Sequence, residues 1–128
     1  MAKRSFSFLA LTILIAIEIF YFSSLTGGKG TGNIPFIAIA YHFTVFFLLA
    51  FFLISTLKSK HTITTLIISI FYAISDEIHQ IYVPLRHGGI PDIIIDTFGI
   101  CCGILIYLHI SKNKSKYIQK ENITYKVE

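Results

Sequence analysis

The chain has 128 residues, of which 54% are hydrophobic and only 14% are charged. A soluble domain is usually about a quarter charged, so too few charges are present here to cover a water-exposed surface. This composition, with a mean hydropathy of +0.70, favours an integral membrane protein and leaves no room for a separate soluble catalytic domain.

Four apolar runs are each long enough for a membrane-spanning helix, which needs about 20 residues. The runs cover residues 6–25, 34–57, 62–82 and 90–110. The basic residues before the first run are typical of a signal peptide, but Glu18 interrupts that run and no A-x-A-like cleavage site follows it. We therefore expect the first run to be retained, and we predict an all-α polytopic membrane protein with four transmembrane helices.

The segments between the runs are typical of loops and turns. Residues 26–33 are rich in Gly and Thr, residues 58–61 form a short basic turn, and residues 83–89 contain one proline and two glycines. We expect residues 1–110 to form one transmembrane domain. The lysine-rich residues 111–128 are expected to form a basic cytoplasmic tail, either flexible, which we favour, or a short amphipathic helix on an anionic membrane surface.

The basic residues also predict an orientation, because cytoplasmic loops of membrane proteins carry an excess of Lys and Arg. The N-terminus, the turn at 58–61 and the tail hold most of them, whereas the other two loops hold only Lys29 and Arg86. We therefore expect both termini to be cytoplasmic, in a multi-pass protein of the plasma membrane. The lysines flank apolar runs instead of forming a phosphate-binding stripe, so no nucleic-acid partner is expected.

Each apolar run carries an ionisable residue, although a charge at the centre of a bilayer costs roughly 2.5–3.5 kcal/mol on insertion scales. With a helical rise of about 1.5 Å per residue, Glu18, His42, Asp76 and Asp96 lie roughly 9–12 Å from the outer ends of their runs. Such residues usually face the protein interior or a wet cavity. We therefore predict that these four side chains converge in the outer half of the membrane.

The end of the third run and the loop after it are unusually polar. Asp76, His79 and Gln80 share one helix face at positions i, i+3 and i+4, and Glu77 lies beside them. Arg86 in the following loop could pair with one of the carboxylates or hold an anionic group in a bidentate fork.

The fourth run begins with a related stripe of residues. Asp92 and Asp96 lie on the same face as Gly99 and Gly103, and small residues at such spacing allow close contact between helices. This face is expected to pack against a partner helix, with two carboxylates at its outer end. Alternatively, Asp92 could serve as a cap that accepts hydrogen bonds from the first backbone N–H groups of the helix.

The stretch SDEIHQIYVPLRHGGIPDIIIDTFGICCG, residues 75–103, contains an acidic pair, Gln, an aromatic residue with Pro–x–Arg, Asp, a second polar position and Gly. This pattern resembles the VanZ-like family of small membrane proteins, and the resemblance extends over roughly residues 6–110. The family is named for a member associated with glycopeptide (teicoplanin) resistance. The resemblance therefore implies a role in the cell envelope or in antibiotic resistance, without a defined biochemical activity. Asp96 stands where the family pattern often has Asn, so the role of that position does not transfer directly.

Three functions remain open. We favour non-catalytic binding, at the outer membrane face, of lipid-linked cell-envelope components or glycopeptide antibiotics. The second is a membrane-embedded enzyme acting on a lipid-linked anionic substrate, and the third is a subunit of a proton-coupled transporter, which would have to oligomerise. The candidate catalytic residues are Asp76, Glu77 and Asp92, and the candidate substrate- or anion-binding residues are Arg86, Gln80, His79, Asp96, His42 and Glu18.

No cofactor is expected from the sequence. The carboxylates could bind a divalent metal, since oxygen ligands suit such ions, but no HExxH or comparable motif supports one. The expected partners are membrane lipids and a lipid-linked envelope precursor.

Overall fold

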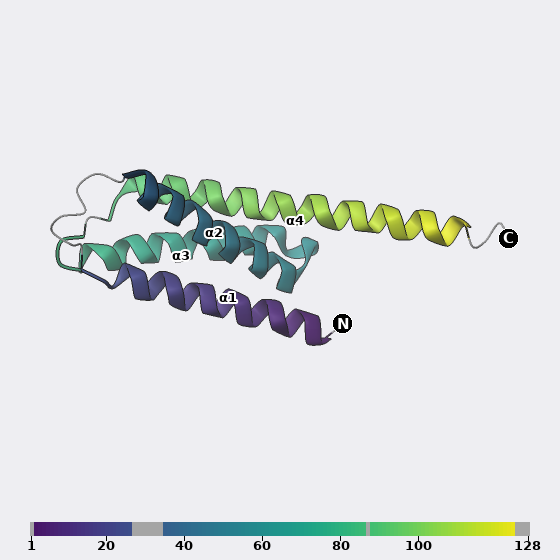
Figure 1. The fold of residues 1–128 in the computed structure, drawn as a ribbon, viewed down its shortest axis with the longest axis horizontal. Coiled ribbons are helices and arrows are strands. Elements are labelled where there is room, and N and C mark those ends of the chain that lie inside the picture. The colour runs from purple at the N-terminus through teal and green to yellow at the C-terminus, as the bar shows by residue number, and fades with distance from the viewer. Residues whose placement is uncertain (1, 27–34, 87, 125–128) are drawn as a thin grey trace.

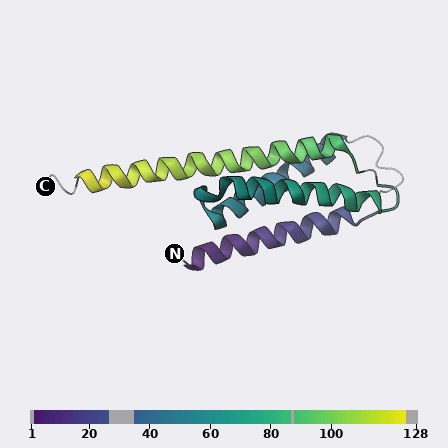
Figure 2. The ribbon, with the colours of Figure 1, turned by 180° about the vertical axis from the view of Figure 1, so that it is seen from behind.

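The structure is a computed structural model, and it describes residues 2–26, 35–86 and 88–124. All regular elements of the described chain are helices, which confirms the all-α part of the predicted fold class. The elements in chain order are α1 (Ala2–Ser23), α2 (Pro35–Leu57), the 3₁₀ turn η1 (Ser59–His61), α3 (Thr62–Ile81) and α4 (Ile90–Thr124). The four helices lie side by side in a bundle, and α4 extends well beyond the other three (Figures 1 and 2).

The two ends of the bundle differ in what they contain. At one end, here called the loop end, α1 and α3 finish and α2 and α4 begin. At the opposite end α1 begins, and η1 joins α2 to α3 (Figure 1). Within the bundle, α2 packs most extensively against α4, α1 packs mainly against α2, and α3 contacts both α2 and α4.

Helix α3 is polar on its inner face and apolar on its outer face, the reverse of a helix in a water-soluble protein. The exposed residues of the outer face include Ile63, Phe71 and Ile81, which are 67%, 70% and 64% exposed. The buried residues of α3 are Thr65, Ser69, Ala73, Asp76, Glu77 and Gln80. This arrangement suits a helix whose outer face contacts lipid and whose polar groups lie inside the bundle.

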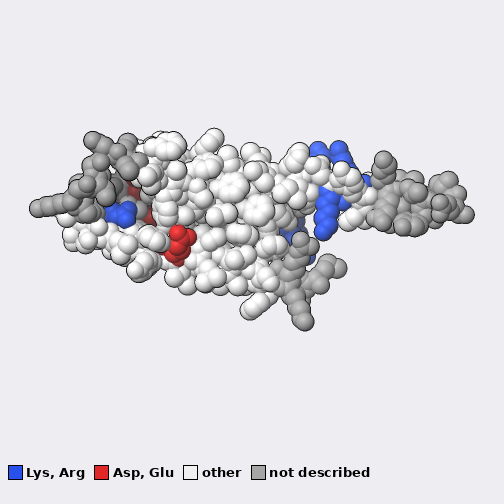
Figure 3. Space-filling view, viewed as in Figure 1, with Lys and Arg blue, Asp and Glu red and all other residues white. Residues whose placement is uncertain are grey.

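Three of the helices are long and apolar enough to cross a membrane, namely Ser5–Ser23 in α1, Phe36–Leu57 in α2 and Ile90–Gln119 in α4. The sequence predicted four such helices. Helix α3 has the expected bounds, but its hydroxyl, carboxylate and amide side chains make it less hydropathic than the three helices named above. On the face shown in Figure 3, basic groups gather mainly towards the end away from the loops, acidic groups and one further basic group lie nearer the loop end, and the stretch between them is uncharged.

Helix α4 does not end at Ile110, where the sequence analysis placed the boundary of the membrane domain. It continues without interruption to Thr124. The lysines after Ile110 are compatible with helix, and neither Gly nor Pro occurs between Ile104 and Thr124 to stop it. The change at Ile110 is therefore a change of composition within one helix, and the first part of the predicted flexible tail is helical.

The contact between α2 and α4 depends on two glycines. A Cβ atom added at Gly99 would lie 2.5 Å from the carbonyl oxygen of Phe43, and one added at Gly103 would lie 2.4 Å from that of Phe47. No real Cβ approaches a neighbour so closely, so a side chain at either position would force the helices apart. The two contacts are one helical turn apart on both helices, and they fix the register that brings His42 opposite Asp96.

Candidate functional site

The centre of the site is a contact between His42 on α2 and Asp96 on α4. The Nδ1 atom of His42 lies 3.0 Å from the Oδ1 atom of Asp96. Both residues are buried, with 8% of His42 and none of Asp96 exposed. The other carboxylate oxygen of Asp96, Oδ2, is also buried and has no hydrogen-bond partner among the described residues.

Glu77 on α3 joins this pair from a third helix. One potential ligand atom from each of His42, Glu77 and Asp96 lies within 4.8 Å of the other two. The Glu77 side chain is held by the backbone N–H of Gly89, which donates to its Oε2 atom at 2.7 Å. A Cβ atom at Gly88 would lie 2.3 Å from the Glu77 carbonyl oxygen, so the loop backbone lies directly against α3 and no side chain fits between them.

Asp76 is linked to this group through an amide. The Nε2 atom of Gln80 donates to Oδ2 of Asp76 at 2.9 Å and to Oε1 of Glu77 at 3.5 Å. All three side chains are buried. We use the name inner cluster for these five side chains from three helices: His42, Asp76, Glu77, Gln80 and Asp96.

Four residues that the sequence analysis placed in the site lie outside the inner cluster, and the first two of them are Glu18 and His79. Glu18 on α1 accepts a hydrogen bond from the Tyr41 hydroxyl at 3.4 Å. His79 points towards α1, where its ring stacks on Phe20 at a centroid distance of 4.6 Å and its Nε2 lies 3.0 Å from the Ser24 hydroxyl. Of the four residues predicted to converge, His42, Asp76 and Asp96 belong to the cluster and Glu18 lies beside it.

Arg86 has partners that the sequence did not indicate. Its Nη2 atom donates to the carbonyl oxygen of Phe22 at 2.6 Å, and its Nε atom donates to that of Leu25 at 3.1 Å. The last carbonyls of a helix lack partners within the helix, so the guanidinium ties the loop after α3 to the end of α1. Two of its donors are thereby used on neutral oxygens, and in the described part of the chain the one ion pair is His42 with Asp96.

Asp92 occupies the first turn of α4 and is partly exposed. Its own backbone N–H donates to the carbonyl oxygen of Gly89 at 3.1 Å. It therefore lies at the rim of the loop end rather than among the buried acids.

Sequence reasoning missed two parts of the site. The first is the loop backbone at Gly88 and Gly89, whose signal was the glycine pair just before α4, since adjacent glycines mark places where backbone approaches closely. The second is Tyr41, which binds Glu18 next to the cluster, and no pattern in the sequence singled it out.

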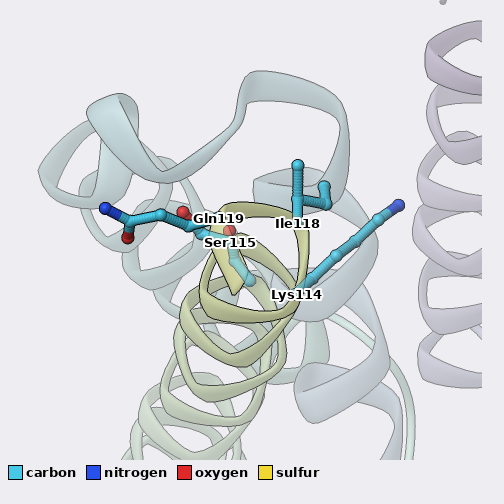
Figure 4. Close-up of a pocket in the computed structure, with 5 residues that line it drawn as sticks. Lys114, Ser115, Ile118 and Gln119 are labelled. Atoms are coloured by element: carbon cyan, nitrogen blue, oxygen red, sulfur yellow. The ribbon is translucent and has the colours of Figure 1, made fainter. Parts of the chain in front are cut away.

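A separate hollow lies on the projecting part of α4 (Figure 4). It is lined by Ser111, Lys114, Ser115, Ile118 and Gln119. All of its lining residues come from one helix surface, far along the chain from the inner cluster, and they offer no converging acid, base or metal ligand. This hollow therefore adds nothing to the candidate site.

Comparison with known proteins agrees with the resemblance seen in the sequence. A family model described as VanZ/LLP1 matches residues 8–111, a range that includes most of α1, the whole of α2 and α3, and the part of α4 that packs in the bundle. No curated protein and no solved structure gives a significant match. Because the family model covers most of the chain, this protein belongs to the VanZ/LLP1 family.

Proposed function

We propose that this VanZ/LLP1 family member is a four-span protein of the plasma membrane that binds the polar part of a lipid-linked cell-envelope component, or of a glycopeptide antibiotic, at the outer face. Binding occurs without turnover of the ligand. The observation that carries the proposal is the inner cluster, which gathers polar side chains from α2, α3 and α4 at the loop end of an otherwise apolar bundle.

The membrane arrangement rests on three apolar helices and on the inverted polarity of α3. With lipid-facing side chains such as Phe71 outside and carboxylates inside, α3 suits a position in the bilayer against α2 and α4. The turn with Lys58 and Lys60 lies at the end opposite to the loop containing Arg86. The excess of basic residues at the former end supports a cytoplasmic location for it and an outer location for the loop end.

The chemistry of the inner cluster indicates which part of a ligand it suits. Asp76, Glu77 and Asp96 supply acceptor oxygens, whereas Arg86 donates to carbonyl oxygens at the end of α1 and just after it. A bare phosphate would be repelled by these acids, whereas amide, hydroxyl and ammonium groups would donate hydrogen bonds to them. The sugar and peptide groups of an envelope precursor or glycopeptide offer such donors, and donor recognition is therefore the role that we propose for the acids of the cluster.

Binding without catalysis is favoured by how firmly the acids are held. Glu77 accepts from the Gly89 backbone, and Asp76 accepts from Gln80. Acids that are fixed by protein donors are suited to recognise a ligand of defined shape, whereas a general acid or base must reach the reacting atom to exchange its proton.

The test is a binding and turnover measurement on the full chain in lipid nanodiscs. We would add a polyprenyl-linked cell-wall precursor in one series and teicoplanin in another, and would follow binding by thermophoresis and ligand mass by mass spectrometry. Saturable binding of either ligand, with its mass unchanged after hours, is expected. Asp76→Asn should weaken binding about tenfold if one charge-assisted hydrogen bond is lost, while Lys60→Ala at the opposite end should bind normally.

Two results would contradict this function. Failure of both ligands to bind saturably would remove the proposed ligand class. Time-dependent appearance of a product, abolished by Asp76→Asn, would instead favour the enzymatic alternative.

A further inference from the structure

We propose that His42, Glu77 and Asp96 form the binding site for one divalent transition-metal ion of the Zn²⁺ class. This site goes beyond the proposed recognition of an envelope ligand and shares Glu77 and Asp96 with it, but its test uses the metal alone. The three residues come from α2, α3 and α4, so a bound ion would join three helices at the loop end.

The distances between the potential ligand atoms are close to those of a metal site. A four-coordinate ion with bonds of about 2.1 Å keeps its ligand atoms about 3.4 Å apart. The His42 and Asp96 atoms are 3.0 Å apart, and all three groups lie within 4.8 Å of one another. Closing the longest separation requires side-chain movement on the order of 1 Å, which small torsional adjustments supply.

The unpartnered oxygen of Asp96 is the second, independent observation. Its Oδ2 atom is buried without a hydrogen-bond partner among the described residues, although the other oxygen of the same carboxylate lies 3.0 Å from His42. The orphan atom therefore belongs to the cluster itself. A buried polar atom without a partner is costly, and coordination of a cation would satisfy it.

The charges of the inner cluster also favour a bound cation. Asp76, Glu77 and Asp96 are three buried acids, whereas the imidazole of His42 is the one basic group among them and Arg86 donates to carbonyls. Buried charges in proteins are usually paired or coordinated to metals. A divalent cation would offset the excess negative charge in a place where water is scarce.

The surrounding groups fit the role of holding the ligands in place. The Gly89 N–H and the Gln80 amide both donate to Glu77, and such outer contacts orient metal-binding carboxylates. One imidazole with two carboxylates is a mixed nitrogen and oxygen set, which favours Zn²⁺ and similar transition ions over Mg²⁺ or Ca²⁺. Three protein ligands leave a fourth position for water or for an oxygen of a bound ligand.

The experiment measures metal content and affinity without any envelope ligand. The full chain in detergent would be stripped with a chelator and titrated with Zn²⁺ by calorimetry. Bound metal would be counted by mass spectrometry after desalting. We expect one ion per chain, and we expect Mg²⁺ and Ca²⁺ to bind at least about tenfold more weakly.

Matched variants then locate the ion. Glu77→Gln and Asp96→Asn keep size and shape while removing a charged ligand, and each should lower Zn²⁺ affinity by more than about tenfold. His42→Asn should do the same. The controls are His61→Asn in η1 and Glu121→Gln near the end of α4, which lie away from the cluster along their helices and should bind as the parent does.

A measurement on the unaltered chain guards against variants that fail to fold. X-ray absorption of the zinc-loaded protein should show one imidazole and otherwise oxygen neighbours. The proposal is overturned if the parent retains no stoichiometric metal, if absorption shows no imidazole ligand, if the control variants lose the ion as well, or if only Mg²⁺ or Ca²⁺ binds.

Discussion

His42 and Asp96 are 54 residues apart in the chain, yet the Nδ1 atom of the first lies 3.0 Å from a carboxylate oxygen of the second. The contact joins α2 to α4, the pair of helices with the most extensive packing in the bundle. On α4, Asp96 lies about one turn before Gly99, and on α2, His42 directly precedes Phe43, whose carbonyl Gly99 contacts, so backbone packing and side-chain pairing at this point depend on each other.

The pair itself is expected to contribute to stability. Removing one partner leaves the other buried without compensation, which typically costs about 3–5 kcal/mol. His42→Ala and Asp96→Ala should therefore each lower the free energy of unfolding by about 3 kcal/mol, and the double variant should lose much less than the sum. Loss of helical circular dichroism on denaturation in detergent would measure this. Additive losses would show that the two side chains are not energetically coupled.

The glycine contacts predict a steric effect that is independent of charge. Gly99→Ala and Gly103→Ala each place a Cβ within 2.5 Å of an α2 carbonyl, so each should destabilise the bundle by about 1–3 kcal/mol, as overpacking usually does. Gly89→Ala is the milder comparison, expected to cost less than either, because its Cβ would make one tight contact, at 3.3 Å with a proline ring atom, and none with a backbone carbonyl. Thermal unfolding in the same detergent compares the three variants, and equal midpoints would contradict the close α2–α4 contact.

Arg86 is expected to protect the end of α1. Arg86→Gln removes the donors to the Phe22 and Leu25 carbonyls, and a lost charge-assisted hydrogen bond is worth about 1.5 kcal/mol or more. Amide hydrogens at the end of α1 should exchange about tenfold faster. Arg86→Lys should restore only part of the protection, since an ammonium lacks the planar fork of a guanidinium. Unchanged exchange in Arg86→Gln would mean that the contact does not hold the helix end.

The passage of α3 through the membrane is tested by cysteine accessibility on either side of it. In a chain with Cys101→Ala and Cys102→Ala, Lys60→Cys lies in the turn before α3 and Tyr82→Cys lies just after it, at a position 81% exposed. A membrane-impermeant maleimide applied to intact cells should label position 82 only. Position 60 should react after permeabilisation. Labelling of both positions from the same side would show that α3 does not cross.

Much of the architecture could be predicted from the sequence because it depends on length and composition. The helices begin close to the predicted positions, and residues at similar depths, such as His42 and Asp96, do meet. The glycine stripe also identified the face of α4 that contacts another helix. These features follow from helical geometry alone, which fixes depth and the direction of a face.

The remaining parts of the site depend on the neighbours of each side chain. His79 and Gln80 are adjacent in the chain, yet the His79 ring stacks on Phe20 of α1, whereas the Gln80 amide donates to the acids of α3. The partners of Arg86 are backbone carbonyls, and every residue has such a carbonyl, so no pattern of residue types identifies them. The full length of α4 was not evident for a simpler reason: the polar residues after Ile110 mark the limit of the apolar segment but do not break a helix.

The inverted polarity of α3 also has a consequence for assembly. In the proposed arrangement, this helix is not apolar enough to enter lipid by composition alone. Among the described residues, its buried acids accept hydrogen bonds from Gln80 of α3 itself and, for Glu77, from Gly89 in the loop that precedes α4, while the His42–Asp96 pair that completes the cluster comes from α2 and α4. The short η1 turn ties its start to α2. Membrane insertion of α3 is therefore expected to be cooperative, with α2 and α3 entering as a helical hairpin and the polar face being completed only when α4 has been synthesised.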